Sequence, residues 1–339
     1  MSNQSKPCVK NRALSALGIL GGTAVAATSA GWILYSKLFI DHNLPLPDAI
    51  PAERKRFYSQ TAGFINYYVD KNGEGERPLL LIHSVNAAAS AYEVGPIFQH
   101  YRSQRPVYAI DLPGYGFSDR TPGIYTPQTF EDAITDLIAF EIGEPVDAIA
   151  ISLGSEFLAG AAMTHPKWFN SITIISPSGF NEPRSGRATQ RANDSGSSNA
   201  LYDMLSFPLW GRALFDLIAT RRSIQFFLSK SFVGEIPPGF VEYAYLSSHQ
   251  PGAEHVPLHF VSGRLFTRNA FQIVYKNVTV PALIIYDEDF YSRFDTLPNL
   301  VEQKENWQAV RLTPSRGLPH FERLSETAVI LNTFWQQSS

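Results

Sequence analysis

The sequence predicts an α/β protein with a mostly parallel, doubly wound sheet. Short apolar runs typical of buried strands occur at residues 79–82, 107–110, 148–151, 172–175, 283–286 and 307–312. Helical patterns, such as those over residues 130–142 and 155–165, lie between most of these runs, and such alternation is typical of parallel sheets. The alternation stops between residues 181 and 281, which predicts an inserted helical unit.

The first 42 residues differ in kind from the rest of the chain. Lys6, Lys10 and Arg12 precede a run over residues 13–36 that contains no charged side chain. A run of that length is sufficient to cross a bilayer as a helix. We therefore expect residues 1–42 to form a basic flank and a single-pass membrane anchor.

Two further features bear on this anchor. Trp32 and Tyr35, near the end of the uncharged run, suit a membrane interface, and the basic flank favours an N-terminus on the inner side. The folded domain is then expected on the extracytoplasmic side. A cleaved signal peptide is the alternative, because the small residues over 24–30 are compatible with a cleavage site.

The remaining chain divides into four predicted segments. The prolines between residues 43 and 51 indicate a spacer. A hairpin of two strands is expected over residues 57–69. The segments are a linker at 43–55, a first core part at 56–180, a linker and helical cap at 181–280, and a second core part at 281–339. Within the third segment, residues 181–199 are rich in Ser, Arg, Asn and Gly and are expected to form a flexible linker.

Composition excludes several classes of function. The formal net charge is -3, so no basic field favours nucleic acid. Cys8 is the single cysteine, so the chain has no intrachain disulfide or redox pair of thiols. Neither a metal-ligand spacing nor a glycine-rich dinucleotide loop is present, and we expect no cofactor and no metal.

The most informative segment is the turn at Ser152. An apolar run ends at this serine, with Ala150 two residues before it, Gly154 two residues after it and a helical pattern following. Small flanking residues allow the backbone to pass close on both sides of a sharp strand-to-helix turn, which exposes the hydroxyl. Ser152 is therefore a candidate nucleophile, although an ordinary helix N-cap serine is the alternative.

Possible partners of Ser152 follow later strands. Asp287, Glu288 and Asp289 come directly after the run at 283–286, and His320 comes after the last strand. A nucleophilic serine requires a base, and the base requires a group that orients it. In a doubly wound sheet these side chains meet beyond the carboxyl ends of the strands.

From residue 56 onwards the chain resembles the α/β-hydrolase superfamily, in particular the capped lipase, esterase and C–C hydrolase branch. The resemblance rests on two motifs besides the serine turn. Residues 80–86 read Leu-Leu-Ile-His-Ser-Val-Asn and resemble the strand and loop that supply half of the oxyanion hole. Residues 111–119 read Asp-Leu-Pro-Gly-Tyr-Gly-Phe-Ser-Asp and match the following strand end and glycine loop.

The resemblance implies a fold and a set of roles. It implies an α/β-hydrolase fold in which Ser152 attacks an acyl carbon and the N–H groups of Val85 and Leu153 stabilise the oxyanion. His320 would be the base and Asp289 would orient it, with Asp287 and Glu288 as rivals for that role. His83 would order the backbone of its loop rather than act in catalysis.

Three positions depart from the family pattern. Ala150 and Ser84 each replace a glycine. In close relatives the catalytic histidine directly precedes the Leu-Pro pair, and here that position is Gly317. His320 stands where many members carry a second, non-catalytic histidine, so either the loop is reshaped to bring His320 to Ser152 or the base is absent.

The sequence thus predicts a membrane-associated serine hydrolase that cleaves an apolar acyl ester through an acyl-enzyme. Acyl transfer and C–C hydrolysis use the same residues and stay open. The alternative is a non-catalytic member that binds an apolar ligand or a protein partner, and the glycine at position 317 motivates it.

Overall fold

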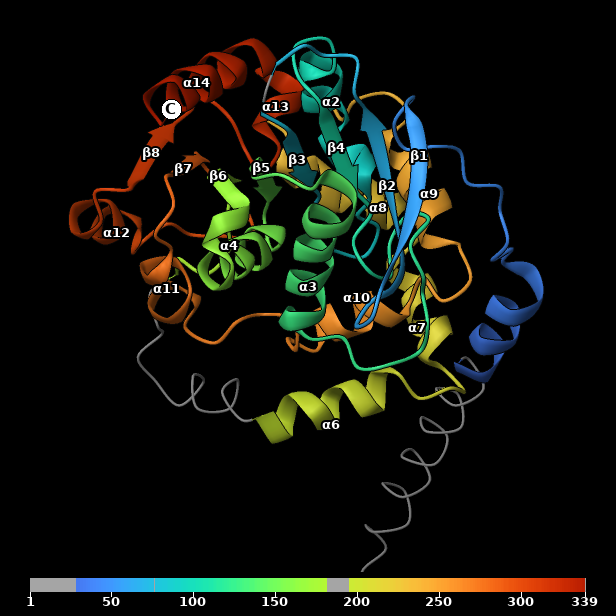
Figure 1. Ribbon diagram of the computed structural model, residues 1–339. Coiled ribbons are helices and arrows are strands. Elements are labelled where there is room, and N and C mark those ends of the chain that lie inside the picture. The colour runs from blue at the N-terminus through green and yellow to red at the C-terminus, as the bar shows by residue number, and fades with distance from the viewer. Residues whose placement is uncertain (1–28, 76, 182–194, 339) are drawn as a thin grey trace, which may run out of the picture.

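One mixed sheet organises the molecule. The computed structural model describes residues 29–75, 77–181 and 195–338, and within these its eight strands lie in the order β1-β2-β4-β3-β5-β6-β7-β8 (Figure 1). Strand β2 runs antiparallel to both of its neighbours, β1 and β4, and all other pairs are parallel. The strands are β1 (Glu53–Ser59), β2 (Gly63–Asp70), β3 (Leu79–Ile82), β4 (Val107–Ile110), β5 (Val146–Ile151), β6 (Phe169–Ile175), β7 (Ala282–Tyr286) and β8 (Trp307–Arg311).

The central strands consist of residues that suit burial on both faces. All residues of β3, β4 and β5 are buried, including the polar Asp147 in β5. Continuous apolar strands of this kind occur where helices cover both sides of a parallel sheet. The predicted mostly parallel sheet is confirmed, and β1 begins at Glu53, inside the segment that was expected to be a linker.

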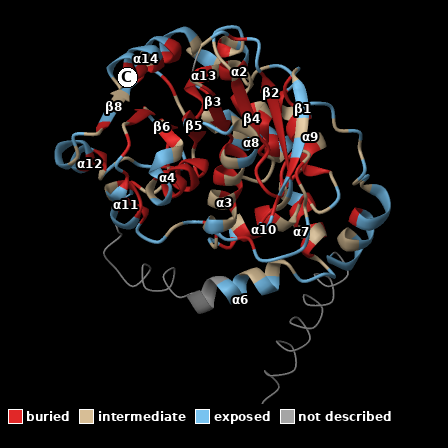
Figure 2. Cartoon of the chain, viewed as in Figure 1, coloured by how far each residue is buried: buried red, intermediate tan, exposed pale blue. Residues whose placement is uncertain are grey.

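Helices cover the two faces of the sheet, and the side chains between the layers form the core (Figure 2). On one face, Phe130 of α3 stacks on Phe157 of α4 with ring centroids 4.5 Å apart. On the other face, Tyr101 of α2 donates a 3.0 Å hydrogen bond to Asn332 of α14. The core helices are α2 (Gly95–Tyr101), α3 (Pro127–Leu137), α4 (Gly154–Thr164), α12 (Leu297–Gln303), α13 (Pro319–Glu322) and α14 (Leu324–Gln337). Short helical turns are η1 (Ala91–Val94), η2 (Ile138–Ile142) and η3 (Pro166–Trp168).

A helical insertion separates β6 from β7, where the alternation of the sequence is interrupted. Its elements are α6 (Ser195–Leu205), α7 (Gly211–Ile218), α8 (Arg221–Leu228), η4 (Ser229–Ser231), α9 (Phe240–Ser248), α10 (His255–Val261), α11 (Ala270–Ile273) and η5 (Tyr275–Asn277). Residues 195–199, expected to belong to a linker, are already helical, whereas residues 182–194 lie outside the described residues. We refer to residues 195–277 as the cap.

A helix over residues 29–39 packs against the cap. The indole Nε1–H of Trp32 donates to the carbonyl oxygen of Ala213 at 2.7 Å, and Ser36 donates to the buried carboxylate of Asp216 at 2.6 Å. The described end of the expected membrane anchor is thus attached to α7. Most of the expected anchor, up to residue 28, lies outside the described residues, and no described helix has both the length and the apolarity needed to span a bilayer.

Candidate active site

Ser152 occupies a sharp turn between β5 and α4. Its backbone has φ of 52°, in the left-handed region that non-glycine residues rarely adopt, and its N–H donates to the carbonyl of Ile175 at 2.9 Å. A Cβ at Gly154 would lie only 2.4 Å from the carbonyl oxygen of His83. The turn therefore requires glycine at 154, and it holds the serine against the loop that follows β3.

His83 fixes that loop from within. Its Nε2 accepts a hydrogen bond from the Leu112 N–H at 3.0 Å, so its Nδ1 carries the proton and donates to the Ser84 carbonyl at 2.6 Å. Burial lowers the pKa of His83 to about 4, which keeps the ring neutral. The expectation that His83 orders backbone is confirmed.

Glu93 holds the same loop from outside, a role that sequence reasoning missed. Its buried carboxylate accepts hydrogen bonds from the Ser84 N–H at 2.8 Å and the Asn86 side-chain amide at 3.1 Å. Burial raises the pKa of Glu93. No sequence pattern marks this residue, because a single glutamate ahead of a helix resembles an exposed one.

The two expected oxyanion donors are free to serve a ligand. Within the part of the chain that the structure describes, neither the Val85 N–H nor the Leu153 N–H donates to another residue. Both residues are buried, with 2% and 1% of their surface exposed. Unpaired buried N–H groups are rare and costly, so a pair beside a strained serine indicates a place for an anionic or carbonyl oxygen.

Three carboxylates follow β7, and their hydrogen bonds and burial show that their structural roles differ. Asp287 accepts hydrogen bonds from Arg311, Thr313 and the Ser315 N–H, at 2.7 to 2.8 Å. Although burial alone would raise the pKa of Asp287, these bonds bring it below its usual value. Asp287 therefore stabilises the junction of β7 and β8, and Glu288 is exposed.

Asp289 is the carboxylate that faces Gly317. Its Oδ1 accepts from the N–H groups of Tyr291 at 2.6 Å and Ser292 at 2.8 Å. A Cβ built on Gly317 would lie 3.0 Å from its Oδ2. Because Cβ and Nδ1 of a histidine are both bonded to Cγ, a histidine at 317 would have its Nδ1 within hydrogen-bonding reach of Asp289. The acid of the expected triad thus lies beside a position without a side chain.

The loop that carries Gly317 is adjacent to the serine turn. Ser176, the residue after β6, makes a long hydrogen bond of 3.5 Å to the carbonyl of Arg316. Strand β6 pairs with β5 through Ile175 and Ile151, so Ser176 and Ser152 follow neighbouring strand ends. Ser176 also has a positive φ, of 46°, which the sequence did not indicate.

His320 is bonded in another direction. Its ring is fully buried, and the Nε2–H donates to the Glu93 carbonyl at 2.7 Å, while Nδ1 has no partner in the described part of the chain. A triad histidine needs the opposite arrangement, with a proton on Nδ1 for the acid and a free Nε2 for the serine. Neither ring nitrogen of His320 contacts Ser152 or Asp289, and its role as base stays a prediction.

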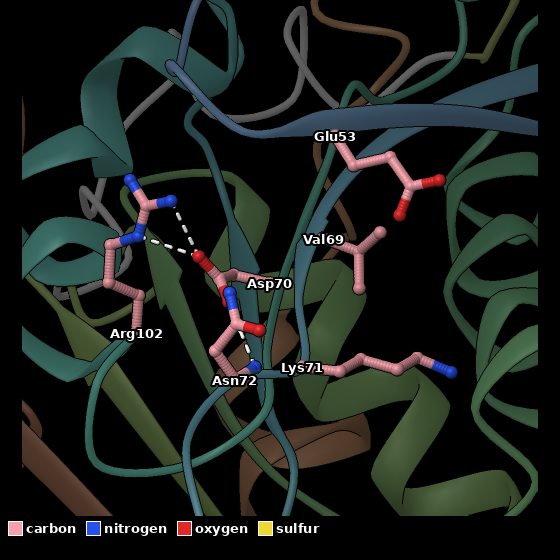
Figure 3. Close-up of a pocket in the computed structure, with 6 residues that line it drawn as sticks. All are labelled: Glu53, Val69, Asp70, Lys71, Asn72 and Arg102. Carbon is pink, nitrogen blue, oxygen red and sulfur yellow. Dashed lines mark hydrogen bonds and ion pairs between the residues drawn. The ribbon is translucent and has the colours of Figure 1, made fainter.

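An open hollow of about 260 Å³ lies away from these residues (Figure 3). It is lined by Glu53, Val69, Asp70, Lys71, Asn72 and Arg102. Asp70 pairs with the first residue of β4, so the hollow is at the amino-terminal edge of the parallel strands, opposite Ser152. Arg102 and Asp70 form an ion pair across it at 2.6 Å. Ligand sites of doubly wound sheets lie at the carboxyl edge, and we assign no function to this hollow.

No group of three or more His, Cys, Asp and Glu side chains in residues 29–75, 77–181 and 195–338 is arranged to hold a metal ion.

Comparison with known proteins identifies the family. Residues 79–328 match the model of the alpha/beta hydrolase family. The abhydrolase domain-containing protein abhd-5.2 of Caenorhabditis elegans is 28% identical over 109 residues, which cover 31% of this chain and 24% of that protein. The match therefore spans about a quarter of the relative's length.

Two solved structures are similar in fold. A membrane phospholipase A, described as a bacterial virulence factor, superposes with a TM-score of 0.65 and 19% identity, covering 95% of this chain and 98% of that one. A thermophilic esterase from Thermogutta terrifontis gives 0.62 and 15%, with coverage of 85% and 99%. The extent of the family match and the shared fold lead to one conclusion: this chain belongs to the alpha/beta hydrolase family.

Proposed function

We propose that this chain binds an apolar acyl ester at Ser152 and supplies no imidazole base of its own. The observation that carries the proposal is the 3.0 Å approach of a Cβ at Gly317 to the Oδ2 of Asp289. Gly317, at the position where the family carries its catalytic histidine, faces Asp289 and has no side chain. His320, the nearest alternative in the sequence, carries its proton on the nitrogen that a base must keep free.

The surroundings of Ser152 support an acyl ester as the ligand. The free N–H groups of Val85 and Leu153 suit a carbonyl oxygen that gains negative charge. Aromatic side chains of the cap lie over the element that follows the oxyanion loop, since Phe240 and Tyr243 contact Tyr92 at centroid distances of 5.0 and 4.9 Å. An apolar site with a few fixed polar groups is typical of small-molecule binding.

A second candidate is a serine ester hydrolase that forms an acyl-enzyme with His320 as base. It is supported by the strained backbone of Ser152, because a left-handed serine costs stability and is kept where it serves a function. The printed descriptions of the similar structures, an esterase and a phospholipase, favour the same chemistry. This candidate requires His320 to leave the Glu93 carbonyl and exchange its tautomer.

Hydrolysis and binding measurements separate the two candidates. Hydrolysis of p-nitrophenyl esters of increasing acyl length is measured for wild type, Ser152→Ala and His320→Ala in buffer without imidazole. Binding of the ether analogue of the same ester, which cannot be hydrolysed, is measured by calorimetry. We expect binding to all three proteins and no hydrolysis above the Ser152→Ala rate. A wild-type rate that both substitutions abolish would establish the second candidate instead.

We also propose that the N-terminal segment associates with a membrane, with the folded domain on the extracytoplasmic side. The described helix over residues 29–39 exposes Leu34, Tyr35, Leu38 and Phe39, and Phe39 is 72% exposed. Exposed aliphatic and aromatic residues along one short helix suit the interface of a bilayer. Flotation of the full chain with lipid vesicles tests this. Leu38→Ser with Phe39→Ser should weaken flotation, and equal flotation of both proteins would argue against a role for this helix.

A further inference from the structure

Two polar side-chain atoms beside Gly317 have no hydrogen-bond partner among the described residues. A Cβ at Gly317 would lie 3.0 Å from Oδ2 of Asp289 and 3.3 Å from Oγ of Ser231. Gly317 is buried, and the family pattern places a side chain at this position. Oγ of Ser152 also has no partner among these residues, and Ser152 follows the strand end next to Ser176, which contacts the carbonyl of Arg316.

The backbone around this position is held on several sides. The Leu318 N–H donates to the carbonyl of Ser231 at 3.2 Å, and the guanidinium of Arg316 donates to the carbonyl of Phe232 at 3.3 Å. Ser176 contacts the Arg316 carbonyl from the sheet side. With His320 bonded to Glu93, no histidine of the described chain is placed to fill the position.

We propose that the Gly317 position receives an imidazole ring from outside the chain, and that Ser152 hydrolyses an apolar acyl ester when the ring is bound. This inference rests on the proposed binding of an acyl ester. The N–H of one ring nitrogen donates a hydrogen bond to Oδ2 of Asp289, and the other nitrogen accepts a hydrogen bond from the hydroxyl of Ser152. An imidazole spans two such groups because its nitrogens lie on opposite sides of the ring.

The reaction needs only the ester, the bound ring and water. The ring takes the proton of Ser152 as Oγ bonds to the acyl carbon, and the free N–H groups of Val85 and Leu153 hold the oxyanion. The bond to the alcohol then breaks, and the alcohol leaves with that proton. Water repeats the sequence on the acyl-enzyme, which releases the acid and restores both Ser152 and the neutral ring.

An aromatic rim beside Asp289 suits a flat ring that becomes cationic. Phe290 and Tyr291 are exposed next to the acid, and the Tyr291 hydroxyl donates to the Phe227 carbonyl of α8 at 2.9 Å. Aromatic faces stabilise cations that lie within about 6 Å of the ring centroid.

The test uses the full chain, purified without imidazole, and p-nitrophenyl decanoate. Because imidazole itself cleaves such esters, the rate of Ser152→Ala at each imidazole concentration is subtracted. We expect the remaining wild-type rate to saturate with imidazole, at on the order of 10²-fold above the rate without it. N-methylimidazole, which has no proton for Asp289, and the Asp289→Asn variant should both lose most of this gain.

A second arm distinguishes the source of the ring. The decanoyl ester of imidazolylmethanol carries its own ring, and its hydrolysis without free imidazole, dependent on Ser152, would indicate a base delivered by the substrate. Rescue only by free imidazole would indicate a separate small molecule. Two results together overturn the inference. The wild-type rate rises linearly with imidazole concentration and equals the Ser152→Ala rate, and the ring-bearing ester is not cleaved.

Two variants keep this result separate from the proposed function. If Gly317→His is active without imidazole while wild type with imidazole is not, the inference fails and the binding of acyl esters stands. If the ether analogue does not bind to wild type, the proposed function fails. Should Gly317→His not fold, as judged by its melting temperature, Gly317→Ala replaces it, because its methyl group should weaken imidazole saturation by occupying the space beside Asp289.

Discussion

The two halves of the candidate active site differ in what they retain. The loops after β3 and β5 present a strained serine and two N–H groups that donate to no described residue, and His83 and Glu93 hold the loop after β3. The loops after β7 and β8 present a carboxylate that faces a glycine, and a histidine whose hydrogen bond goes to a backbone carbonyl. The nucleophile half, which holds Ser152, has the parts expected of a hydrolase. The acid–base half, which holds Asp289, lacks the side chain that the family pattern places at position 317.

In this chain the strained turn at Ser152 forms although position 317 has no side chain. The serine turn is fixed by β5, α4 and the contact of Gly154 with His83, all of which belong to the core. The acid–base half is built from loops, where one substitution changes chemistry without changing the fold.

The largest effect is expected from restoring a ring at position 317. In Gly317→His the new Nδ1 lies within reach of Asp289, so fluorophosphonate labelling of Ser152 should accelerate by roughly 10²- to 10⁴-fold over wild type. Labelling rates measured by intact-protein mass give the ratio. The double variant with Ser152→Ala is the control and should not be labelled. Equal rates for wild type and Gly317→His would show that the nucleophile half is not competent.

The next effect concerns the buried ring of His320 and pH. Burial lowers the pKa of His320 to about 4, from 6.5 in an exposed histidine. Between these values the unfolded chain binds a proton that the folded chain does not, so the free energy of unfolding falls as pH decreases from 6.5 to 4. The loss attributable to one such histidine is on the order of 3 kcal/mol at the lower end.

Replacement by glutamine isolates this contribution. The amide of His320→Gln can donate to the Glu93 carbonyl but does not titrate, so urea unfolding at several pH values should show a weaker pH dependence than wild type. Part of the pH dependence should remain in this variant, because burial also lowers the pKa values of His83 and His259 to about 4. An unchanged slope would mean that His320 is protonated or solvated in the folded protein.

A matched pair of alanine substitutions compares the two halves directly. In Gly154→Ala the new Cβ meets the His83 carbonyl at 2.4 Å, and the backbone must shift, which should cost about 2 kcal/mol of unfolding free energy. In Gly317→Ala the new Cβ meets the end of the Asp289 side chain, which can move, so a change within about 0.5 kcal/mol is expected. Chemical denaturation measures the free energy of unfolding of both variants. Equal losses of stability would contradict the view that the Ser152 half is held more rigidly than the Asp289 half.

An effect smaller than that of Gly154→Ala is expected at Ser152 itself. Glycine relieves a left-handed backbone conformation that costs roughly 1–2 kcal/mol, but its own entropy loss is about 0.5–1 kcal/mol. Ser152→Gly should therefore be about 0.5–1 kcal/mol more stable than wild type. Ser152→Ala retains the strain and serves as the reference in the same denaturation experiment. A less stable glycine variant would show that the serine side chain supports the turn.

Much of the fold followed from local patterns. Strands such as β5 are continuous apolar segments because helices cover both faces of the sheet, and such segments can be recognised in a sequence. The turn at Ser152 was legible because Ala150 and Gly154 are small on both sides of it. Boundaries were less accurate: β1 starts within the expected linker, and α6 starts within the expected flexible segment.

The family resemblance favours Asp289 among three adjacent acidic residues, but no local pattern separates it from Asp287 and Glu288. Asp287 and Asp289 are two positions apart on one loop, yet Asp287 binds Arg311 and Asp289 faces Gly317. That outcome depends on where β8 and the following loop pass, and no local pattern encodes it. Glu93 was missed for the same reason, because its partners Ser84 and Asn86 approach it only after β3 and η1 pack together.

By itself, the sequence determined the class of the fold, the position of the serine and the absence of a histidine before the Leu-Pro pair, since each is a property of neighbouring residues. The tertiary structure decided which acid faces Gly317 and which way His320 is bonded. Both depend on contacts between segments far apart in the chain; Glu93 and His320, which form one hydrogen bond, lie 227 positions apart. The physical reason is that a side chain's protonation and direction follow from what packs around it, whereas strand and helix patterns follow from the chain itself.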